Sequence, residues 1–227
     1  MDDWRPPDVM ITVDLVALTI RDDVLHVLLV ERGVEPFRGR LALPGGFVQK
    51  DEALQDAAVR ELEEETHIPV NLLHLEQLGT YGNPGRDPRG RVITVVYLAV
   101  APDLPAPVGD TDAAAARWVP LSVGMPLAFD HERILQDGVE RARAKLEYTT
   151  IAAAFCAERF TMGDLRRVYE IVWGVRLDPR NFQRKVLNTE SFVVSVNEVR
   201  RQDSGRPAQL YMRGRARLLY PSILRSQ

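Results

Sequence analysis

The chain has 227 residues, more than the usual single domain of about 100–150, so it makes either one large domain or two small ones. Its composition, 45% hydrophobic and 27% charged, excludes a disordered chain, a collagen-like repeat and a coiled-coil rod. No apolar run approaches the roughly 18 residues of a membrane span. The lone Cys156 excludes an internal disulfide and a thiolate metal cluster, and we expect it to be buried. With no hydrophobic leader at the amino terminus, these features favour a cytoplasmic protein.

Charge is divided unequally along the chain. Residues 151–227 carry fourteen basic and seven acidic residues, a net charge of +7, whereas the first 150 residues carry −10. This asymmetry predicts two domains, at residues 1–149 and 150–227, of which the basic one is a candidate for nucleic-acid binding. Unequal halves also arise by chance, so charge alone does not decide the partner.

The acidic part has the pattern of an α+β domain. Strands are predicted at residues 9–20, 24–30 and 92–100, with a short strand near 116–119 and a strand at 41–49 broken by Pro44-Gly45-Gly46. Helices are predicted at residues 51–66 and 129–146. Because the strands and helices do not alternate strictly, we expect a mixed sheet with helices packed on it.

The helix at residues 51–66 directs acidic side chains inward. At about 100° per residue its inward stripe consists of Leu54, Ala57, Ala58 and Leu62. Glu61 and Glu65 fall inside this stripe and Glu64 lies beside it. Ionised carboxylates in such a place are costly unless a cation compensates them. A divalent ion such as Mg²⁺ would do so, whereas the alternative is a solvated acidic face on a helix that packs elsewhere.

These residues belong to a longer motif. It runs from Gly46 through five residues to Glu52, then through seven residues to the stretch Arg-Glu-Leu-Glu-Glu-Glu at residues 60–65. The motif resembles the Nudix box, which implies a Nudix α/β/α sandwich that binds a nucleoside diphosphate linked to another group. It also implies that Glu61, Glu64 and Glu65 hold Mg²⁺ and activate a water, with Arg60 and Glu52 orienting them.

One position departs from the Nudix box. His67 replaces a glycine that lets the helix end in a left-handed turn, a backbone that costs histidine about 1 kcal/mol. The loop after the helix is therefore expected to differ, while the carboxylates are all present. We expect His67 itself to be a helix-end or surface residue rather than a ligand.

A second cluster of charge follows in the loop at residues 81–91. Arg86, Arg89 and Arg91 stand within six residues, beside a glycine, and arginine forks suit phosphate oxygens. The stretch Arg-Asp-Pro-Arg resembles one in Nudix proteins that handle ADP-ribose, which implies that this ligand is bound by the three arginines and Gly46. A solvated basic hairpin is the alternative.

The basic part has the pattern of a helix-turn-helix. After a helix predicted at residues 151–160, Thr161 and Asp164 form a capping box that opens a second helix ending at Gly174. Asp178 and Pro179 then start a third helix, which buries Phe182 and Val186. Its opposite face displays Arg180, Asn181, Arg184, Lys185 and Asn188. Arginine and asparagine can read base edges in a major groove, so these residues predict a DNA-binding helix.

Two further strands, at residues 191–201 and 208–213, enclose a polar tip and predict a wing. Arg206 at the tip is a predicted DNA contact, and Arg200, Arg201 and Arg213 are expected to face phosphates. The alternative is a helical appendage that mediates dimerisation and carries solvated arginines.

From residue 9 to about residue 220 the chain is similar to the Nudix-related transcriptional regulators. This resemblance implies that the Nudix domain senses ADP-ribose and that the winged helix, in a homodimer, represses genes of NAD synthesis or salvage. The runner-up function is a Mg²⁺-dependent ADP-ribose pyrophosphatase, either alone or together with the regulatory role. A nucleotide-binding interaction module without either activity is the third class.

Overall fold

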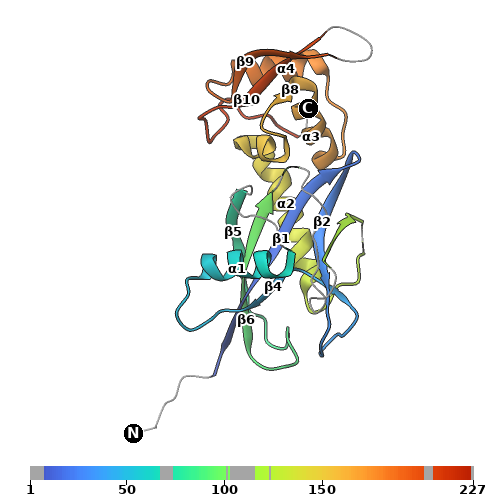
Figure 1. Cartoon of the computed structure of the whole chain (residues 1–227), viewed down its shortest axis with the longest axis vertical. Helices are drawn as coiled ribbons and strands as arrows, with labels where there is room; N and C mark the ends of the chain where they lie inside the picture. Colours follow the sequence, from blue (N-terminus) through green and yellow to red (C-terminus); the bar gives the residue numbers. More distant parts are fainter. Residues whose placement is uncertain are drawn as a thin grey trace.

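The computed structural model describes residues 8–66, 74–100, 102, 116–122, 124–201 and 207–225. Two parts are stacked along the long axis of the molecule (Figure 1). The elements of the first part are β1 (Met10–Arg21), β2 (Val24–Glu31), β3 (Leu41–Ala42), β4 (Gly45–Phe47), α1 (Leu54–Thr66), β5 (His74–Tyr81), β6 (Val92–Val100), β7 (Arg117–Pro120) and α2 (His131–Tyr148). Those of the second part are a 3-10 helix (Thr150–Phe155), β8 (Phe160–Thr161), α3 (Met162–Trp173), α4 (Pro179–Asn188), β9 (Val193–Arg200) and β10 (Ala208–Arg213).

The sheet of the first part is mixed, as predicted. Its strands follow the order β3-β2-β1-β6-β5, with β4 paired to β1 and β7 paired to β2. The pairing of β1 with β6 is parallel and the other pairings are antiparallel. This central pair is buried on both faces because alternate residues of β1 enter two different hydrophobic clusters.

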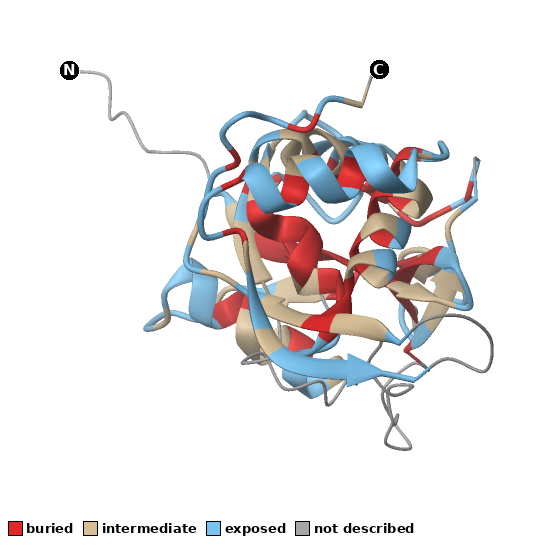
Figure 2. Cartoon of the chain, turned by 90° about the horizontal axis from the view of Figure 1, so that it is seen from above, coloured by how far each residue is buried: buried red, intermediate tan, exposed pale blue. Residues whose placement is uncertain are grey.

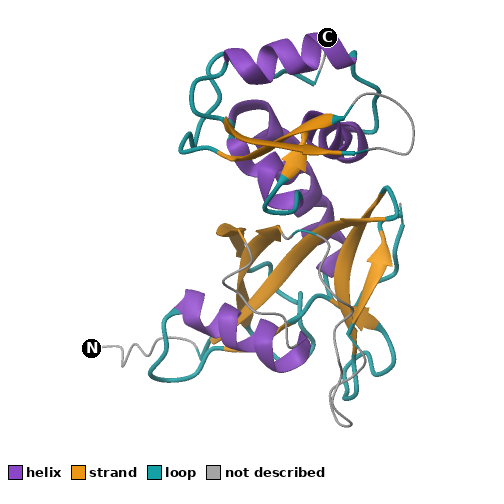
Figure 3. Ribbon diagram, turned by 45° about the horizontal axis from the view of Figure 1, so that its top comes forward, coloured by secondary structure: helices purple, strands orange, loops and turns teal. Residues whose placement is uncertain are grey.

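Helices α1 and α2 cover the two faces of the sheet (Figures 1 and 3). On one face Val13 and Leu15 of β1 share a cluster with Ala58 of α1, and on the other Val16 of β1 shares a cluster with Ile134 of α2. The α+β fold with an α/β/α sandwich is therefore confirmed. Residues Ala57, Ala58 and Leu62 of the predicted inward stripe are buried.

The sequence prediction missed two details of this part. Leu54 is exposed, because α1 begins there rather than three residues earlier, so the first helical turn lies beyond the core. Strand β5 was not predicted at all. Its exposure pattern shows no clean alternation, and its pairing with β6 shifts register between Gln77 and Gly79, so periodicity gives little signal there.

Helix α2 packs directly on the central strand through a glycine. A Cβ atom built at Gly138 would stand 2.7 Å from Cγ1 of Val16, so the helix backbone rests on that side chain. The predicted inward face of the helix, which includes Ile134, Leu135, Val139 and Ala142, is buried. Close approach at Gly138 thus fixes the height of α2 above the sheet.

The two parts of the molecule share one hydrophobic core. A single cluster of buried residues contains Val16 and Leu98 of the sheet, Leu146 of α2, and Tyr169 and Phe182 of the second part. At the junction the indole nitrogen of Trp173 donates to the carbonyl of Arg143 at 3.0 Å. The predicted boundary between residues 149 and 150 falls where α2 ends and the 3-10 helix begins, and it stays a prediction.

The second part confirms the local signals read from the sequence, with one correction. Thr161 and Asp164 form the predicted capping box, Gly174 closes α3 in the left-handed conformation, and Asp178 caps α4. The helix predicted at residues 151–160 is wrong: this segment forms a 3-10 helix up to Phe155 and then leads into strand β8. Its apolar side chains fill the junction core, which tertiary packing favours over a longer α-helix.

Seen from the end that carries the second part, buried residues gather beneath exposed helical and loop segments (Figure 2). Cys156 is buried, as expected. Throughout the described residues, every helix is too short or too polar to cross a membrane.

The contact of Gly138 with Val16 predicts an unusual response to a helix-favouring substitution. Gly138→Ala should destabilise the fold by about 1–3 kcal/mol, because the added methyl group overpacks against β1. Urea unfolding measures this change. Gln136→Ala, at an exposed position of the same helix, is the control. A gain in stability of Gly138→Ala, as helix propensity alone would give, contradicts the packing.

Candidate nucleotide pocket and nucleic-acid interface

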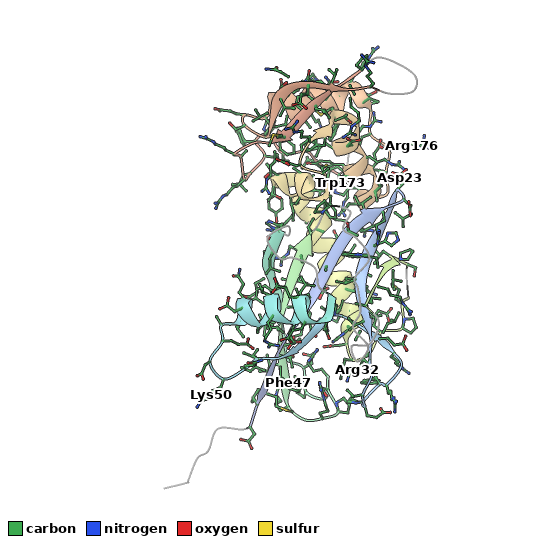
Figure 4. All side chains as sticks on the ribbon, in the orientation of Figure 1. Asp23, Arg32, Phe47, Lys50, Trp173 and Arg176 are labelled. Atoms are coloured by element: carbon green, nitrogen blue, oxygen red, sulfur yellow. The ribbon has the colours of Figure 1, made fainter. Side chains whose placement is uncertain are left out.

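A pocket of about 380 Å³ opens at the end of the sheet away from the second part. Its walls come from β1, β2, β4, α1, the loop after β5 and the first turn of α2. Figure 4 shows Arg32 and Phe47, two of its lining residues, in this lower part of the molecule. The pocket therefore gathers residues from six separate segments of the chain.

One side of the pocket is acidic and belongs to the predicted Nudix helix. Glu65 accepts a hydrogen bond from the backbone N–H of Gly45 at 3.0 Å, and burial raises the pKa of this carboxyl group to about 8. Burial also raises the pKa of Glu61. A Cβ atom at Gly46 would stand 2.2 Å from Oε1 of Glu61, so only glycine leaves room for this carboxylate.

Arg60 holds the other members of the predicted acidic set. Its guanidinium group donates to both oxygens of Glu52, at 2.7 and 3.0 Å, to Glu61 at 2.7 Å and to Glu64 at 3.1 Å. These bonds hold the pKa of Glu52 below its usual value and raise that of Arg60. The predicted orienting role of Arg60 toward these carboxylates thus has a direct geometric basis.

Another part of the pocket lining carries arginine and aromatic side chains, and Arg89 is paired there with the carboxylate of Asp87 at 2.7 Å. The guanidinium carbon of Arg32 lies 4.7 Å from the ring centre of Phe129, and that of Arg89 lies 5.0 Å from the ring centre of Phe47. Burial, and then the positive charge of Arg89, lower the pKa of Arg32. Its Nη2 atom is buried and has no hydrogen-bond partner among the described residues. Such a wall suits an anion attached to a planar group.

The floor of the pocket is a buried polar network. Arg86 donates two hydrogen bonds to Asp130, at 2.7 and 3.0 Å, and its Nη2 atom lies 3.9 Å from Asp14. Asp14 also accepts a hydrogen bond from Thr94 at 2.6 Å. The network closes at His131, whose Nε2 atom stands 3.7 Å from Asp14.

His131 has a defined tautomer in this network. Its Nδ1 atom accepts a hydrogen bond from the backbone N–H of Leu43 at 3.0 Å, so in the neutral ring the proton is on Nε2, which faces Asp14. Burial lowers the pKa of His131, even though Asp14 acts in the opposite direction. The first turn of α2 is thereby tied to the pocket floor.

The predicted ligand residues divide into two groups. Gly46, Arg86 and Arg89 line the pocket. Arg91 lies outside it, because its side chain is exposed and donates to the carbonyl of Gly82 instead. His67 lies outside the described residues.

Sequence reasoning missed lining residues that include Arg32, Phe47, Phe129 and His131. Phe47 is inside the box motif but at a position that the motif leaves undefined. Arg32 directly follows the end of β2 at Glu31, Phe129 lies just before α2, and His131 is the first residue of α2. No local pattern marks them, since only the closure of the sheet brings them to one place.

The second candidate site is the outer face of α4. Phe182 and Val186 are buried, and Arg180, Asn181 and Arg184 are exposed while Lys185 is half-buried. Arg184 donates to the side chain of Asn181 at 2.7 Å, so two of the predicted base-reading groups lie side by side. This face has the shape and chemistry of a recognition helix.

The phosphate contacts expected for the wing stay predictions. Strands β9 and β10 pair as predicted, but Arg200 donates to Asp164 at 2.8 Å, so its charge is already matched by a carboxylate. Arg201 is exposed. Arg206 lies outside the described residues.

An α/β/α sandwich with an acidic helix after a glycine turn, joined to a helix-turn-helix with a wing, defines a Nudix domain fused to a DNA-binding module. Comparison with known proteins agrees. The NUDIX domain family matches residues 10–137, and the family described as the NrtR DNA-binding winged helix domain matches residues 152–212. The chain belongs to the NrtR family of Nudix-related transcriptional regulators.

Two curated relatives are similar to the chain. The ADPR responsive transcriptional repressor NtrR of Acinetobacter baylyi is 34% identical over 209 residues, which cover 90% of this chain and 82% of that protein. The ADP-ribose pyrophosphatase of Methanocaldococcus jannaschii is 44% identical over 113 residues, which cover 49% of this chain and 64% of that enzyme.

Two solved structures are similar as well. Shewanella oneidensis NrtR complexed with a 27mer DNA superposes with a TM-score of 0.80 at 35% identity, covering 89% of this chain and 93% of that one. The NUDIX domain of the same protein complexed with ADP ribose gives a TM-score of 0.56 at 37% identity, covering 62% of this chain and 94% of that one.

The buried network around His131 predicts a pH dependence of stability. Because the folded pKa lies below the unfolded value of about 6.5, the unfolded chain binds more protons in acid, and stability falls as pH drops below about 6.5. His131→Asn keeps an acceptor for the N–H of Leu43 but does not titrate. Urea unfolding at about pH 5 and pH 7.5 should therefore show the wild type gaining stability relative to the variant as pH rises. A difference that does not change with pH contradicts the assignment.

Proposed function

We propose that this protein is a transcriptional repressor that binds DNA through α4 and senses ADP-ribose in the pocket of its Nudix domain. The observation that carries the proposal is that one helix, α2, begins in the floor of the pocket at His131 and ends where the winged-helix part starts. Helix α2 therefore connects the pocket to the part of the molecule that carries the DNA-binding face.

The pocket supports the choice of ligand. A nucleoside diphosphate linked to a sugar offers phosphate charge for the guanidinium groups of Arg32 and Arg89 and a planar base for the rings of Phe47 and Phe129. Gly46, Arg86 and Arg89 are the predicted ligand contacts that line this pocket. The names of the Acinetobacter and Shewanella proteins favour ADP-ribose within this class.

The DNA-binding face supports the choice of partner. On α4, Arg180, Asn181 and Arg184 are exposed and Lys185 is half-buried, and we assign these four residues and Arg206 to the DNA interface. Helix-turn-helix proteins commonly bind two half-sites as dimers, so we assign a homodimer as the active form. By the family resemblance, the regulated genes are those of NAD synthesis or salvage.

Sensing requires a free-energy difference between two states of the repressor. ADP-ribose changes DNA binding only to the extent that it binds the DNA-free arrangement of the two winged helices better or worse than the DNA-bound one. Such coupling between sites is typically about 1–3 kcal/mol. The shared core and α2 are the structures through which the pocket would affect that balance.

Arg184→Ala tests the DNA-binding face. If Arg184 reads a base, the substitution should weaken operator binding by about 1–3 kcal/mol and relax the preference at that position. Fluorescence anisotropy with duplexes from upstream of the gene and of its neighbours gives the affinities. Arg133→Ala, an exposed arginine of α2, is the control. Unchanged binding and selectivity of the Arg184 variant would remove it from the interface.

The acidic side of the pocket favours a second candidate function, hydrolysis of ADP-ribose. Glu61 and Glu65 are carboxylates with raised pKa values and Glu64 lies beside them, a set of oxygen donors that suits a hard ion such as Mg²⁺. As placed, no three acidic, histidine or cysteine side chains of the described residues stand close enough together to hold a metal. Mg²⁺ would have to replace contacts that Arg60 makes with Glu61 and Glu64.

In this role Glu61, Glu64 and Glu65 would hold the ion, whose chemistry is to activate a water near neutral pH. Arg60 and Glu52 would position the carboxylates, and the guanidinium groups of Arg32 and Arg89 would hold the diphosphate. A single pocket could bind ADP-ribose, cleave it and signal its presence.

Glu64→Gln tests the hydrolase. Mg²⁺-dependent release of AMP from ADP-ribose should fall by at least about 100-fold, because the variant loses a charged ligand position of the helix. Glu63→Gln, at a neighbouring exposed position outside the acidic set, should retain the activity. No turnover by the wild type would leave the protein as a sensor alone.

A further inference from the structure

The segment that follows β10 carries arginines in a regular arrangement. Between residues 213 and 217 exposure alternates: Arg213, Arg215 and Arg217 are exposed, whereas Gly214 and Ala216 are half-buried. The segment continues from the end of β10 at which Arg213 pairs with Val193. It therefore lies at the opposite end of the β9–β10 hairpin from the pairing of Ala208 with Arg200.

The backbone of this segment is anchored to the turn that leaves α4. Gly214 donates to the carbonyl of Phe192 at 2.8 Å, and Ala216 donates to the carbonyl of Ser191 at 2.9 Å. A Cβ atom at Gly214 would stand 2.0 Å from the Ser191 oxygen, so a small residue is required on the inward side. These hydrogen bonds hold the segment against Ser191 and Phe192, which follow three and four residues after the end of α4. The side chains of its arginines are exposed.

Some arginines of the second part are matched by carboxylates, whereas others, such as Arg180 on α4, are exposed without such a pair among the described residues. Arg159 pairs with Glu198 at 2.6 Å, Arg200 pairs with Asp164 at 2.8 Å, and Arg225 pairs with Glu140 at 3.0 Å. By contrast, the side chains of Arg215 and Arg217 have no hydrogen bond or ion pair with any residue that the structure describes. Two unneutralised charges on an anchored backbone form a surface that attracts anions.

We propose that Arg215 and Arg217 form a phosphate-binding strip that extends the DNA interface beyond the C-terminal end of α4. This inference rests on the proposed DNA-binding function and assigns it a contact outside the helix and the wing. Both side chains are exposed, with one half-buried residue between them, and a guanidinium fork suits phosphate oxygens. Each of the two side chains can therefore hold a phosphate of the DNA backbone.

The strip positions the protein without reading sequence, which distinguishes it from Arg184. Removing a phosphate contact weakens binding about equally on all sequences and lowers the salt dependence of binding, by about 1 in the slope of log affinity against log salt per contact. Removing a base contact changes the preference among sequences instead.

The test is the double variant Arg215→Gln/Arg217→Gln in the full-length protein, titrated by anisotropy onto a labelled duplex of arbitrary sequence over a series of salt concentrations. The salt slope should fall by about 2 relative to wild type, with equal weakening on unrelated duplexes. Arg215→Lys/Arg217→Lys should restore most of the slope. Arg117→Gln, an exposed arginine of the Nudix part, should leave the slope unchanged.

Three results would overturn the inference. A slope equal to that of wild type would remove the strip from the DNA interface. Altered sedimentation of the variant, with a change in oligomeric state, would assign these arginines to a contact between copies of the chain. A wild type that binds no duplex even at low salt would overturn the proposed DNA-binding function itself, and the strip with it.

Discussion

The close packing of α2 on β1, with the backbone of Gly138 against Val16, is the constraint on which the rest of the molecule depends. Eighteen residues of one helix are held at a fixed height above the sheet, so its first turn reaches the pocket floor and its last turn reaches the winged-helix part. The hydrophobic cluster continues from the sheet through α2 to Tyr169 and Phe182, so the two parts pack against each other in one core.

The same helix explains why the pocket floor is polar. Asp130 caps α2 but makes no side-chain hydrogen bond to the helix; its carboxylate binds Arg86 instead. His131, one residue further, holds the backbone of Leu43 and faces Asp14. The buried network thus joins β1, the arginine loop, the turn after β3 and the start of α2. A ligand that contacts Arg86 is therefore one hydrogen-bonded side chain away from the start of α2.

Much of this organisation could be predicted from the sequence, where local chemistry determines local structure. The capping box at Thr161, the left-handed Gly174 and the Asp178-Pro179 start of α4 are such signals, and the structure confirms them. Helical periodicity likewise predicts that Glu61 and Glu65 lie on the inward side of α1, where burial raises both pKa values.

What could not be predicted depends on contacts between distant segments. Arg32 and Phe129 meet only because β2 and the start of α2 converge at one end of the sheet, and neither has a motif of its own. Residues 151–160 have helical periodicity, yet they form a 3-10 turn because their apolar side chains fill the junction core. Counting basic residues also overestimates the positive charge that a surface offers to DNA, because ion pairs neutralise part of it. Arg200 on the wing, for example, is paired with Asp164.

The central claim is that binding of ADP-ribose in the pocket and binding of DNA by α4 are thermodynamically coupled. Linkage makes this reciprocal, so the affinity for ADP-ribose must depend on whether DNA is bound. Calorimetric titration of ADP-ribose, without Mg²⁺, into the free protein and into the protein saturated with operator DNA measures it directly. The account predicts dissociation constants that differ by about 5–150-fold. Equal constants, with ADP-ribose bound in both cases, would contradict it.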